Sequence, residues 1–408
     1  MKNKTRILSN IITLSFITAT MLHATNGDNL IGIGAKSRGM GGTSVAVNHG
    51  AESGLNNPSL MTYVENTEVS FGGTLFLPDI SSGFVGTPSY TSAADVNTIP
   101  EVSIAHRINE NWFVGIGIWG TAGMGVDFTK APISPALGNI NMVTNLQLIQ
   151  FGAPIAYKTG GLSLGVTPIV QYGNLDINYH KPTGPGTFKN IGTGIAQDFG
   201  VGYNLGISYD FTANGVEGLL VGATYKSKLE MNFDGIFKTV TSEFNGGGLP
   251  DLYSGDALEQ PAEFGVGFSY STEHHTFAFD YKNIKWGDAK GYSSFGWEDQ
   301  DVFAVGYEYR QDNWAARIGY NHASSAVVEL QDPRLNLFNL LGFPATAESH
   351  YTIGGTYAIS DDFSIDLAYV YQPTTTKTFN TAPLPFPGTE FSVDHQEQSY
   401  SFQLNFKF

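Results

Sequence analysis

Strict alternation of apolar and polar residues over long stretches is the feature that most constrains the fold of this chain. In residues 201–211 the odd positions are Val, Tyr, Leu, Ile, Tyr and Phe, and the even positions are Gly, Asn, Gly, Ser and Asp. Successive side chains of a strand point to opposite faces, so such a stretch has one apolar face and one polar face. The pattern recurs in residues 263–270, 303–310 and 363–371. The chain is therefore predicted to be all-β.

Short turns and long connections alternate between the predicted strands. Turns after even-numbered strands are short and polar, as at Asn109–Asn111, Thr159–Gly161 and Gln311–Asn313. Bacterial transmembrane barrels have an even number of strands, with short periplasmic turns and longer extracellular loops. We therefore expect a transmembrane β-barrel of about 14 antiparallel strands. The predicted strands are near 67–77, 99–108, 111–120, 146–158, 161–178, 198–211, 216–232, 260–272, 274–284, 300–310, 313–322, 348–360, 362–372 and 395–408.

The composition agrees with a barrel and argues against several other functions. Charged residues make up 14% of the chain, below the roughly 25% of soluble domains. The formal net charge of −16 disfavours nucleic acid as a partner, because phosphate binding needs clustered Lys and Arg. The chain has no cysteine, which excludes disulfides and thiolate chemistry.

The N-terminus is predicted to be a signal peptide. Lys2, Lys4 and Arg6 precede an apolar stretch, residues 7–22, that is interrupted by Ser, Thr and Asn. A positive segment followed by a short apolar segment is typical of secretory signals, and this one is too short and polar for a spanning helix. We expect residues 1–24 to be removed and the mature chain to reside in the outer membrane of a Gram-negative bacterium.

The last predicted strand carries a second export feature. Tyr400, Phe402, Leu404, Phe406 and Phe408 share one face, and the other face is polar. An alternating strand that ends on an aromatic residue resembles the signal by which the barrel assembly machinery recognises outer-membrane proteins. Phe408 is therefore interpreted as an assembly signal.

Residues 25–66 lack alternation and are rich in glycine. Glycine permits positive φ angles and close approach of the backbone to other groups. A barrel of about 14 strands has a lumen too wide for wall side chains alone to fill. We expect residues 25–66 to form a plug inside a barrel of residues 67–408; an extended periplasmic tail is the alternative.

Gly39-Met40-Gly41-Gly42-Thr43 and, further along, Asn57-Pro58-Ser59 are two motifs that resemble the N-terminal hatch of the FadL/TodX outer-membrane transport family. That family shows a Met-Gly-Gly-Ala run followed by Asn-Pro-Ala, and here Thr43 and Ser59 replace the alanines. Further similarity occurs around 337–341, 350–354 and 309–320, so the resemblance spans nearly the whole mature chain. The matching hatch residues are Gly39, Met40, Gly41, Gly42, Asn57, Pro58 and Ser59.

The resemblance implies passive uptake of long-chain fatty acids or aromatic hydrocarbons, with lateral release at a kinked third strand. Glycine within a strand marks bulges and bends, although these glycines could equally make room for the plug. The candidate kink residues are Gly117, Gly120, Gly123 and Gly125.

Candidate ligand contacts lie in the sixth long connection and on lumen-facing strand positions. An apolar loop should fold into the lumen or contact a hydrophobic ligand, or else it packs against neighbouring loops. Arg310 and Arg317 could meet a ligand carboxylate or pair with Glu308 and Glu263. The apolar candidates are Leu337, Phe338, Leu340, Leu341 and Phe343.

Other functions are weaker readings of the sequence. Gly115, Gly117 and Gly120 fit a dinucleotide pattern, but they lie inside a strand rather than before a helix. A protein-interaction or surface-protein export barrel of the same fold is the main alternative; a barrel enzyme and a general porin are two others. We expect a monomeric transporter, not an enzyme, with no metal or cofactor. Its expected partners are a hydrophobic small molecule, outer-membrane lipid and lipopolysaccharide.

Overall fold

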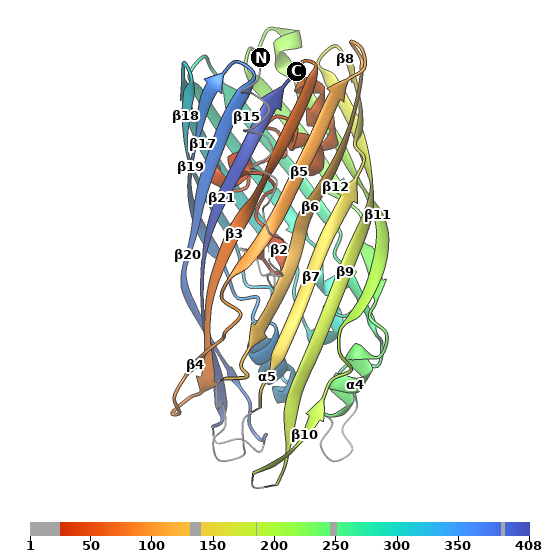
Figure 1. Ribbon diagram of the computed structural model, residues 1–408, viewed down its shortest axis with the longest axis vertical. Helices are drawn as coiled ribbons and strands as arrows, with labels where there is room; N and C mark the ends of the chain where they lie inside the picture. Colours follow the sequence, from red (N-terminus) through yellow and green to blue (C-terminus); the bar gives the residue numbers. More distant parts are fainter. Residues whose placement is uncertain (1–24, 131–139, 185, 245–250, 385–387) are drawn as a thin grey trace, which may run out of the picture.

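A closed antiparallel barrel forms the wall of the protein in a computed structural model that describes residues 25–130, 140–184, 186–244, 251–384 and 388–408 (Figure 1). The barrel has 14 strands, with β7 and β8 together forming one of them. Strand β21 pairs with β3 from Phe391–Phe84 to Lys407–Glu68, which closes the ring. The wall strands are β3 (Thr67–Phe84), β5 (Asn97–Arg107), β6 (Trp112–Asp127), β7 (Val143–Gly152), β8 (Ile155–Thr159), β9 (Leu162–Gly184), β11 (Ala196–Asp210), β12 (Leu219–Lys226), β15 (Glu263–Ser271), β16 (His275–Ile284), β17 (Gln300–Gln311), β18 (Trp314–Ala323), β19 (Ser349–Ser360), β20 (Phe363–Asn380) and β21 (Glu390–Lys407).

The predicted strand count is confirmed, but one predicted strand divides. The alternating residues 216–232 were expected to form one strand, whereas the wall strand β12 ends at Lys226. Residues Leu229–Asn232 form β13, which pairs with β14 (Ala257–Gln260) in a separate hairpin. Leu229 and Met231 are buried, so the apolar alternation that predicted a continuous strand is satisfied inside the lumen instead.

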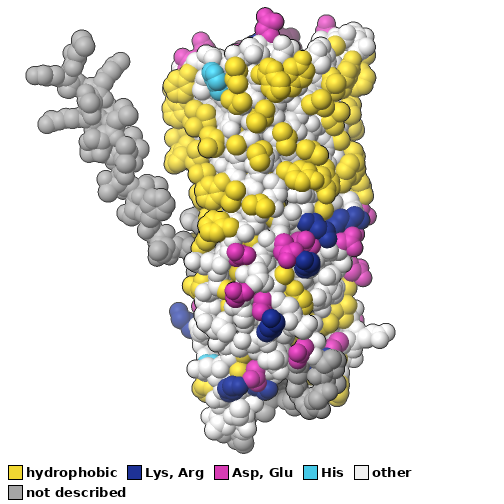
Figure 2. All heavy atoms as spheres, turned by 90° about the vertical axis from the view of Figure 1, so that its right-hand side faces the viewer, with side chains coloured by type: hydrophobic (Ala, Val, Ile, Leu, Met, Phe, Trp, Pro, Cys, Tyr) yellow, Lys and Arg dark blue, Asp and Glu magenta, His cyan; other side chains and the backbone are white. Residues whose placement is uncertain are grey.

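The outer face of the barrel is apolar around the short-turn half. Val201, Phe268 and Ile318 are among its exposed side chains. Figure 2 shows apolar side chains covering the upper part of one face, with charged side chains gathered below them. Of the helices in the described residues, none is both long and apolar enough to cross a membrane.

The N-terminal segment, residues 25–66, lies inside the ring of strands (Figure 1). Its first helix donates Ala35 N–H to Gln403 Oε1 at 2.9 Å, and Arg38 within it pairs with Glu101 of the wall at 2.5 Å. The predicted signal peptide, residues 1–24, lies outside the described residues. The elements of the segment are β1 (Thr25–Asn26), β2 (Asn29–Leu30), α2 (Ala35–Gly39), α3 (Ser53–Asn56) and η1 (Pro58–Tyr63).

Several short elements gather at the long-connection end of the barrel, where Figure 1 shows α4 and α5. The helix α5 begins at Pro333, and the Asp332 carboxylate caps it by accepting Arg334 N–H at 2.9 Å. A proline at the first helical position and an aspartate cap are favoured because the first helical N–H groups lack partners in the helix. The elements at this end are β4 (Tyr90–Thr91), β10 (Thr187–Ile191), α4 (Ile236–Ser242), η3 (Trp286–Asp288), η4 (Ser293–Phe295) and α5 (Pro333–Gly342), whereas η2 (Phe211–Asn214) lies in a short turn at the opposite end.

Candidate ligand path and lateral gap

The inward faces of the wall strands are polar toward the short turns and apolar toward the long connections. Along β9 the buried, inward side chains change from Ser163 and Thr167 to Leu175 and Ile177. The alternate positions of these strands point outward, so this change divides the lumen into two halves of different chemistry. The inward residues of β21 show the same change, in order Gln403, Ser401, Ser399, Glu397, His395, Val393 and Phe391.

Wall and loop residues meet in the long-connection half to form an apolar cluster. Phe295 and Phe338 stack with ring centroids 5.0 Å apart, and Asn339 of α5 donates to the Phe295 carbonyl at 2.8 Å. The loop helices lie inside the mouth of the barrel because burial there removes their apolar side chains from water. The apolar cluster includes Met124, Val126, Leu146, Leu148, Leu175, Ile177, Phe237, Trp286, Tyr292, Phe295, Trp297, Leu337, Phe338, Leu340, Leu341 and Phe343.

All five apolar ligand-contact candidates therefore lie within this cluster, on α5 or directly after it. The two arginine candidates do not. Arg317 is buried, and its Nε lies 2.6 Å from Glu308 Oε2. Arg310 pairs with Oε1 of the same carboxylate at 2.8 Å. The other suggested partner, Glu263, pairs with Lys226 at 3.0 Å. Both arginines thus belong to the polar half and share the Glu308 carboxylate, and Arg317 Nη1 also lies 3.6 Å from Asp366 Oδ1.

The motif residues Gly39–Gly42 lie against the wall in the polar half. The Gly41 N–H donates to Thr352 Oγ1 at 2.9 Å, and that hydroxyl donates to the Gly39 carbonyl at 3.1 Å. Beyond them, the Ser44 and Val45 N–H groups both donate to Asp280 Oδ2, at 2.6 and 2.9 Å. Side chains of the wall therefore replace secondary structure as partners for this stretch of backbone.

The second motif, Asn57-Pro58-Ser59, forms a turn that is bound on both sides. Asn57 Oδ1 accepts the Ser59 N–H at 3.1 Å, while its Nδ2 donates to the Val45 carbonyl at 2.6 Å. Ser59 Oγ donates to Ser208 Oγ on β11 at 3.0 Å. The turn therefore joins the middle of the segment to the wall just before β3 begins.

Glycines of the wall allow this close approach. A Cβ on Gly206 would clash with the side-chain oxygen of Asn57, and one on Gly165 would lie 2.5 Å from the Pro58 backbone. Gly319 and Gly354 face Gly41 and Gly39 in the same way. The alternating glycines on the inward strand faces therefore mark where the N-terminal segment touches the wall.

Pairing between β5 and β6 stops partway along the wall. Their register runs from Arg107–Phe113 to Glu101–Trp119, and beyond this the described part of β6 pairs with β7 and the N-terminal segment, while its last residue, Asp127, accepts the Ala93 N–H at 2.8 Å. The register between β6 and β7 shifts between Gly120 and Ala122. A bulge bends a strand, and this shift directly follows the last β5–β6 pair, so we take the stretch of β6 beyond Trp119 that is unpaired with β5 as the candidate lateral gap.

The N-terminal segment covers this gap from inside. Asn29 pairs with Ala122, and the Asp28 carbonyl accepts the Gly123 N–H at 3.1 Å. Leu30 packs beside Phe76 and Ile99, the apolar residues that border the gap. Movement of these few residues would uncover the gap without unpairing the rest of the barrel.

The four candidate kink glycines have different surroundings. Gly120 lies at the register shift, and Gly123 bonds the N-terminal segment just beyond it. A Cβ on Gly117 would lie 2.5 Å from Leu55 of the N-terminal segment, whereas one on Gly125 would meet the Thr144 backbone. The register shift and the close approach to the N-terminal segment thus involve different glycines of one strand.

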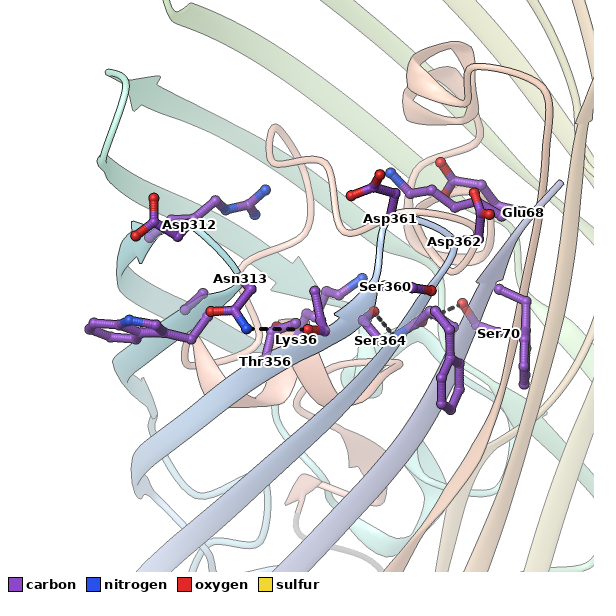
Figure 3. A pocket seen from close by; sticks show the side chains of 18 of the residues that line it. Lys36, Glu68, Ser70, Asp312, Asn313, Thr356, Ser360, Asp361, Asp362 and Ser364 are labelled. Carbon is purple, nitrogen blue, oxygen red and sulfur yellow. Dashed lines mark hydrogen bonds between the residues drawn. The ribbon is translucent and has the colours of Figure 1, made fainter.

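A polar pocket of about 180 Å³ opens at the short-turn end (Figure 3). Lys36 lines it from the N-terminal segment, and Glu68, Asp361 and Asp362 line it from the wall. The Lys36 ammonium also lies 3.6 Å from the buried Asp366 carboxylate. Basic and acidic side chains line the pocket in equal numbers, and it lies at the opposite end of the lumen from the apolar cluster.

One polar group at the boundary of the two halves could not be found from the sequence. Asp28 is fully buried, and its carboxylate accepts hydrogen bonds from the Tyr292 hydroxyl and from Gln260 Nε2. Burial raises the pKa of Asp28 to about 7, although these hydrogen bonds lower it in part. Asp28 followed by Asn29 belongs to no recognisable sequence motif, and its partner Tyr292 is 264 residues away.

Two other groups of the N-terminal segment have shifted pKa values. Burial lowers the pKa of His49 to about 4, opposed by its hydrogen bond to the Thr43 carbonyl. Burial also raises the pKa of Glu52, and the nearby Lys36 counteracts this shift. The segment therefore carries three groups whose protonation depends on its docked position.

A closed barrel with an apolar outer band and long connections at one end defines a transmembrane β-barrel of the bacterial outer membrane. Residues 24–408 match the family described as outer membrane protein transport protein (OMPP1/FadL/TodX), and the chain belongs to this family. It is accordingly an outer-membrane protein, with its short turns in the periplasm and its long connections outside.

Curated relatives and solved structures agree with this assignment. A 47 kDa outer membrane protein of Pasteurella multocida is 21% identical over 86% of this chain and 87% of its own length. A long-chain fatty acid transport protein of Escherichia coli is 24% identical over 78% of this chain and 68% of its own length. The Pseudomonas putida toluene transporter TodX superposes with a TM-score of 0.70 at 17% identity, over 94% of this chain and 100% of that one. A Pseudomonas aeruginosa FadL homologue gives 0.71 at 15% identity over the same shares, which shows the shared fold.

Proposed function

We propose that this protein carries hydrophobic molecules passively across the outer membrane, with residues 25–66 acting as its hatch. The apolar cluster is the observation that carries the proposal. A channel for water and ions needs a polar lumen, whereas here the extracellular half is lined by residues such as Leu146 and Leu175 and filled by Phe338. A hydrophobic ligand can replace these contacts at little cost, because it offers equivalent apolar surface.

The geometry supports a path with a sideways exit. A ligand would enter among the extracellular connections, occupy the apolar cluster and meet the hatch at Asp28–Leu30. Displacement of Leu30 would open the gap between β5 and β6 toward the bilayer. Relatives are named for the transport of long-chain fatty acids and of toluene, so both ligand classes are candidates for this chain.

A single engineered disulfide tests the path. A Cβ on Gly120 would lie 3.7 Å from Ile99 Cβ, and disulfides join Cβ atoms that are about 3.8 Å apart. The chain has no cysteine of its own, so Ile99→Cys with Gly120→Cys would form one bond across the gap. We expect the oxidised double variant to lose uptake of labelled toluene, fatty acid or alkylphenol, and a reductant to restore it.

The single variants Ile99→Cys and Gly120→Cys are the matched controls and should transport under both conditions. Transport by the oxidised double variant at the wild-type rate would place the exit elsewhere. If cells expressing the wild-type protein take up none of these three ligands faster than cells without it, the proposed function is wrong.

A further inference from the structure

Asp28 lies where the hatch meets the apolar cluster, and half of its carboxylate is unsatisfied. Oδ2 accepts hydrogen bonds from Tyr292 and from Gln260 at 3.2 Å, and Gln260 also donates to the Tyr292 hydroxyl at 3.0 Å. Among the residues that the structure describes, none donates to Oδ1. A buried acceptor without a partner is unfavourable, so a ligand that donates a hydrogen bond to Oδ1 would be held there.

Aromatic rings surround this carboxylate on the extracellular side. The rings of Trp286 and Tyr292 have centroids 4.7 Å apart, and Trp297 lies 5.2 Å from the first and 4.7 Å from the second. Trp286 also covers Gly27, where a Cβ would lie 2.6 Å from the indole. The leading end of a ligand that passes through the apolar cluster would therefore reach aromatic surface first and then Asp28.

The charges at this boundary are negative. A second buried carboxylate, Glu397, accepts the Thr25 N–H at 3.2 Å. His395 and His350 lie 3.0 and 3.3 Å from it. No ion pair between Asp28 and a lysine or arginine occurs in the described part of the chain.

The nearby cations of the lumen are occupied by other groups. Lys226 pairs with Glu263 at 3.0 Å, and Lys282 donates to the Gly42 carbonyl at 3.4 Å. Arg38 pairs with Glu101 deeper in the polar half. Above pH 7, where Asp28 is mostly ionised, an ionised carboxylate that arrived there would thus lose its water and meet another anion rather than a cation.

We propose that Asp28 selects the substrate class: it binds uncharged hydrophobic molecules that carry a hydroxyl group, such as alkylphenols or long-chain alcohols, and excludes ionised carboxylates of the same size. This inference rests on the proposed function. A site that holds a substrate hydroxyl discriminates strongly against analogues that cannot donate, because its own polar group is then left unpaired.

A matched pair of ligands tests the selection. The full-length protein in detergent would be titrated at pH 8 with a 4-alkylphenol and with the 4-alkylbenzoate of the same alkyl length, using tryptophan fluorescence. This pH lies above the pKa of about 7 for Asp28, so its carboxylate is mostly ionised. We expect the phenol to bind on the order of tenfold more tightly, and Asp28→Asn to bring the two affinities together by strengthening benzoate binding.

Two further variants isolate the charge of Asp28. Tyr292→Phe removes a neighbour and keeps the carboxylate, so the preference for phenol should persist; loss of that preference would overturn the assignment to Asp28. Asp394→Asn, on the exposed face of β21, should leave both affinities unchanged. Equal binding of phenol and benzoate by the folded wild-type protein would refute the inference and leave the proposed function intact. Failure to bind either ligand would count against the proposed function itself.

Discussion

The periplasmic half of the lumen and the extracellular half are both filled, but by groups of opposite chemistry. The hatch is held by hydrogen bonds to wall residues such as Thr352 and Asp280 and by the Arg38–Glu101 pair. The apolar cluster is held by contacts among Phe338, Phe295 and their neighbours. Water competes for the first kind of contact, and a hydrophobic ligand competes for the second. We propose that these two closures act in series to keep ions out, while each half remains open to a different competitor.

Removing both closures should have the largest effect. Deleting residues 27–56 together with residues 333–342 should raise ion conductance in planar bilayers on the order of tenfold above either deletion alone, because wall side chains cannot fill a lumen of this width. Each single deletion is the control for the other. Full conductance after deletion of residues 27–56 alone would show that the apolar cluster does not close the barrel.

A substitution that disturbs the fit of the hatch backbone against its neighbours should have the second largest effect. Gly42 has φ +82°, and a Cβ there would lie 2.0 Å from the Ile31 carbonyl oxygen. Gly42→Ala should therefore weaken hatch docking by about 3 kcal/mol, from strain and overpacking together. Limited proteolysis of the refolded barrel would report this as faster cleavage within residues 25–66.

Gly86 supplies the matched control, since it has φ +86° and no atom within 4 Å of the added Cβ. Gly86→Ala should cost only about 1 kcal/mol, from its backbone conformation. Equal protease sensitivity of the two variants would mean that the Gly42 contact does not hold the hatch.

Protonation of Asp28 should give the smallest effect. Its pKa is about 7 when the hatch is docked and returns toward its usual 3.8 in water, so the docked state holds the proton. The stabilisation is present at low pH and is lost as the pH rises through 7. Between pH 6 and pH 8 the docked hatch should lose about 1.4 kcal/mol from this group.

Other groups titrate in the same experiment, so the comparison is between wild type and Asp28→Asn. His49, with a lowered pKa, acts in the opposite sense, and Glu52, with a raised pKa, acts in the same sense as Asp28. Protease sensitivity of the hatch, measured across this pH range, should rise more in the wild type than in the variant. Parallel pH profiles would exclude Asp28 as a contributor.

The wall strands could be predicted from the sequence because successive residues of a barrel strand face the lipid and the lumen in turn, which gives the sequence a period of two. The same period failed at residues 229–232, since alternation cannot distinguish a strand of the wall from a hairpin folded inside it. It also placed Arg310 and Arg317 on the lumen side without showing which half of the barrel they occupy. To assign them to a half, the position of each residue along its strand was needed. The change from polar Ser163 to apolar Leu175 along β9 carried that information.

The hatch contacts were predictable only in part. Glycine content and the two motifs marked residues 25–66, and the inward glycines at 165, 206, 319 and 354 were a readable sign of close backbone approach. Asp28, Gln260 and Tyr292 meet only through the closure of the whole barrel. No local pattern links residues from three distant segments, so this site required the structure.

The position of a bound ligand tests the central claim most directly. Crystals of the full-length protein grown with a brominated alkane would locate the ligand by the anomalous scattering of bromine. We predict a bromine peak inside the apolar cluster, between Phe338 on α5 and Trp286, with the hatch still docked or shifted at Asp28–Leu30. Bromine found only against the exposed outer face, with ordered water running through the cluster, would contradict the account.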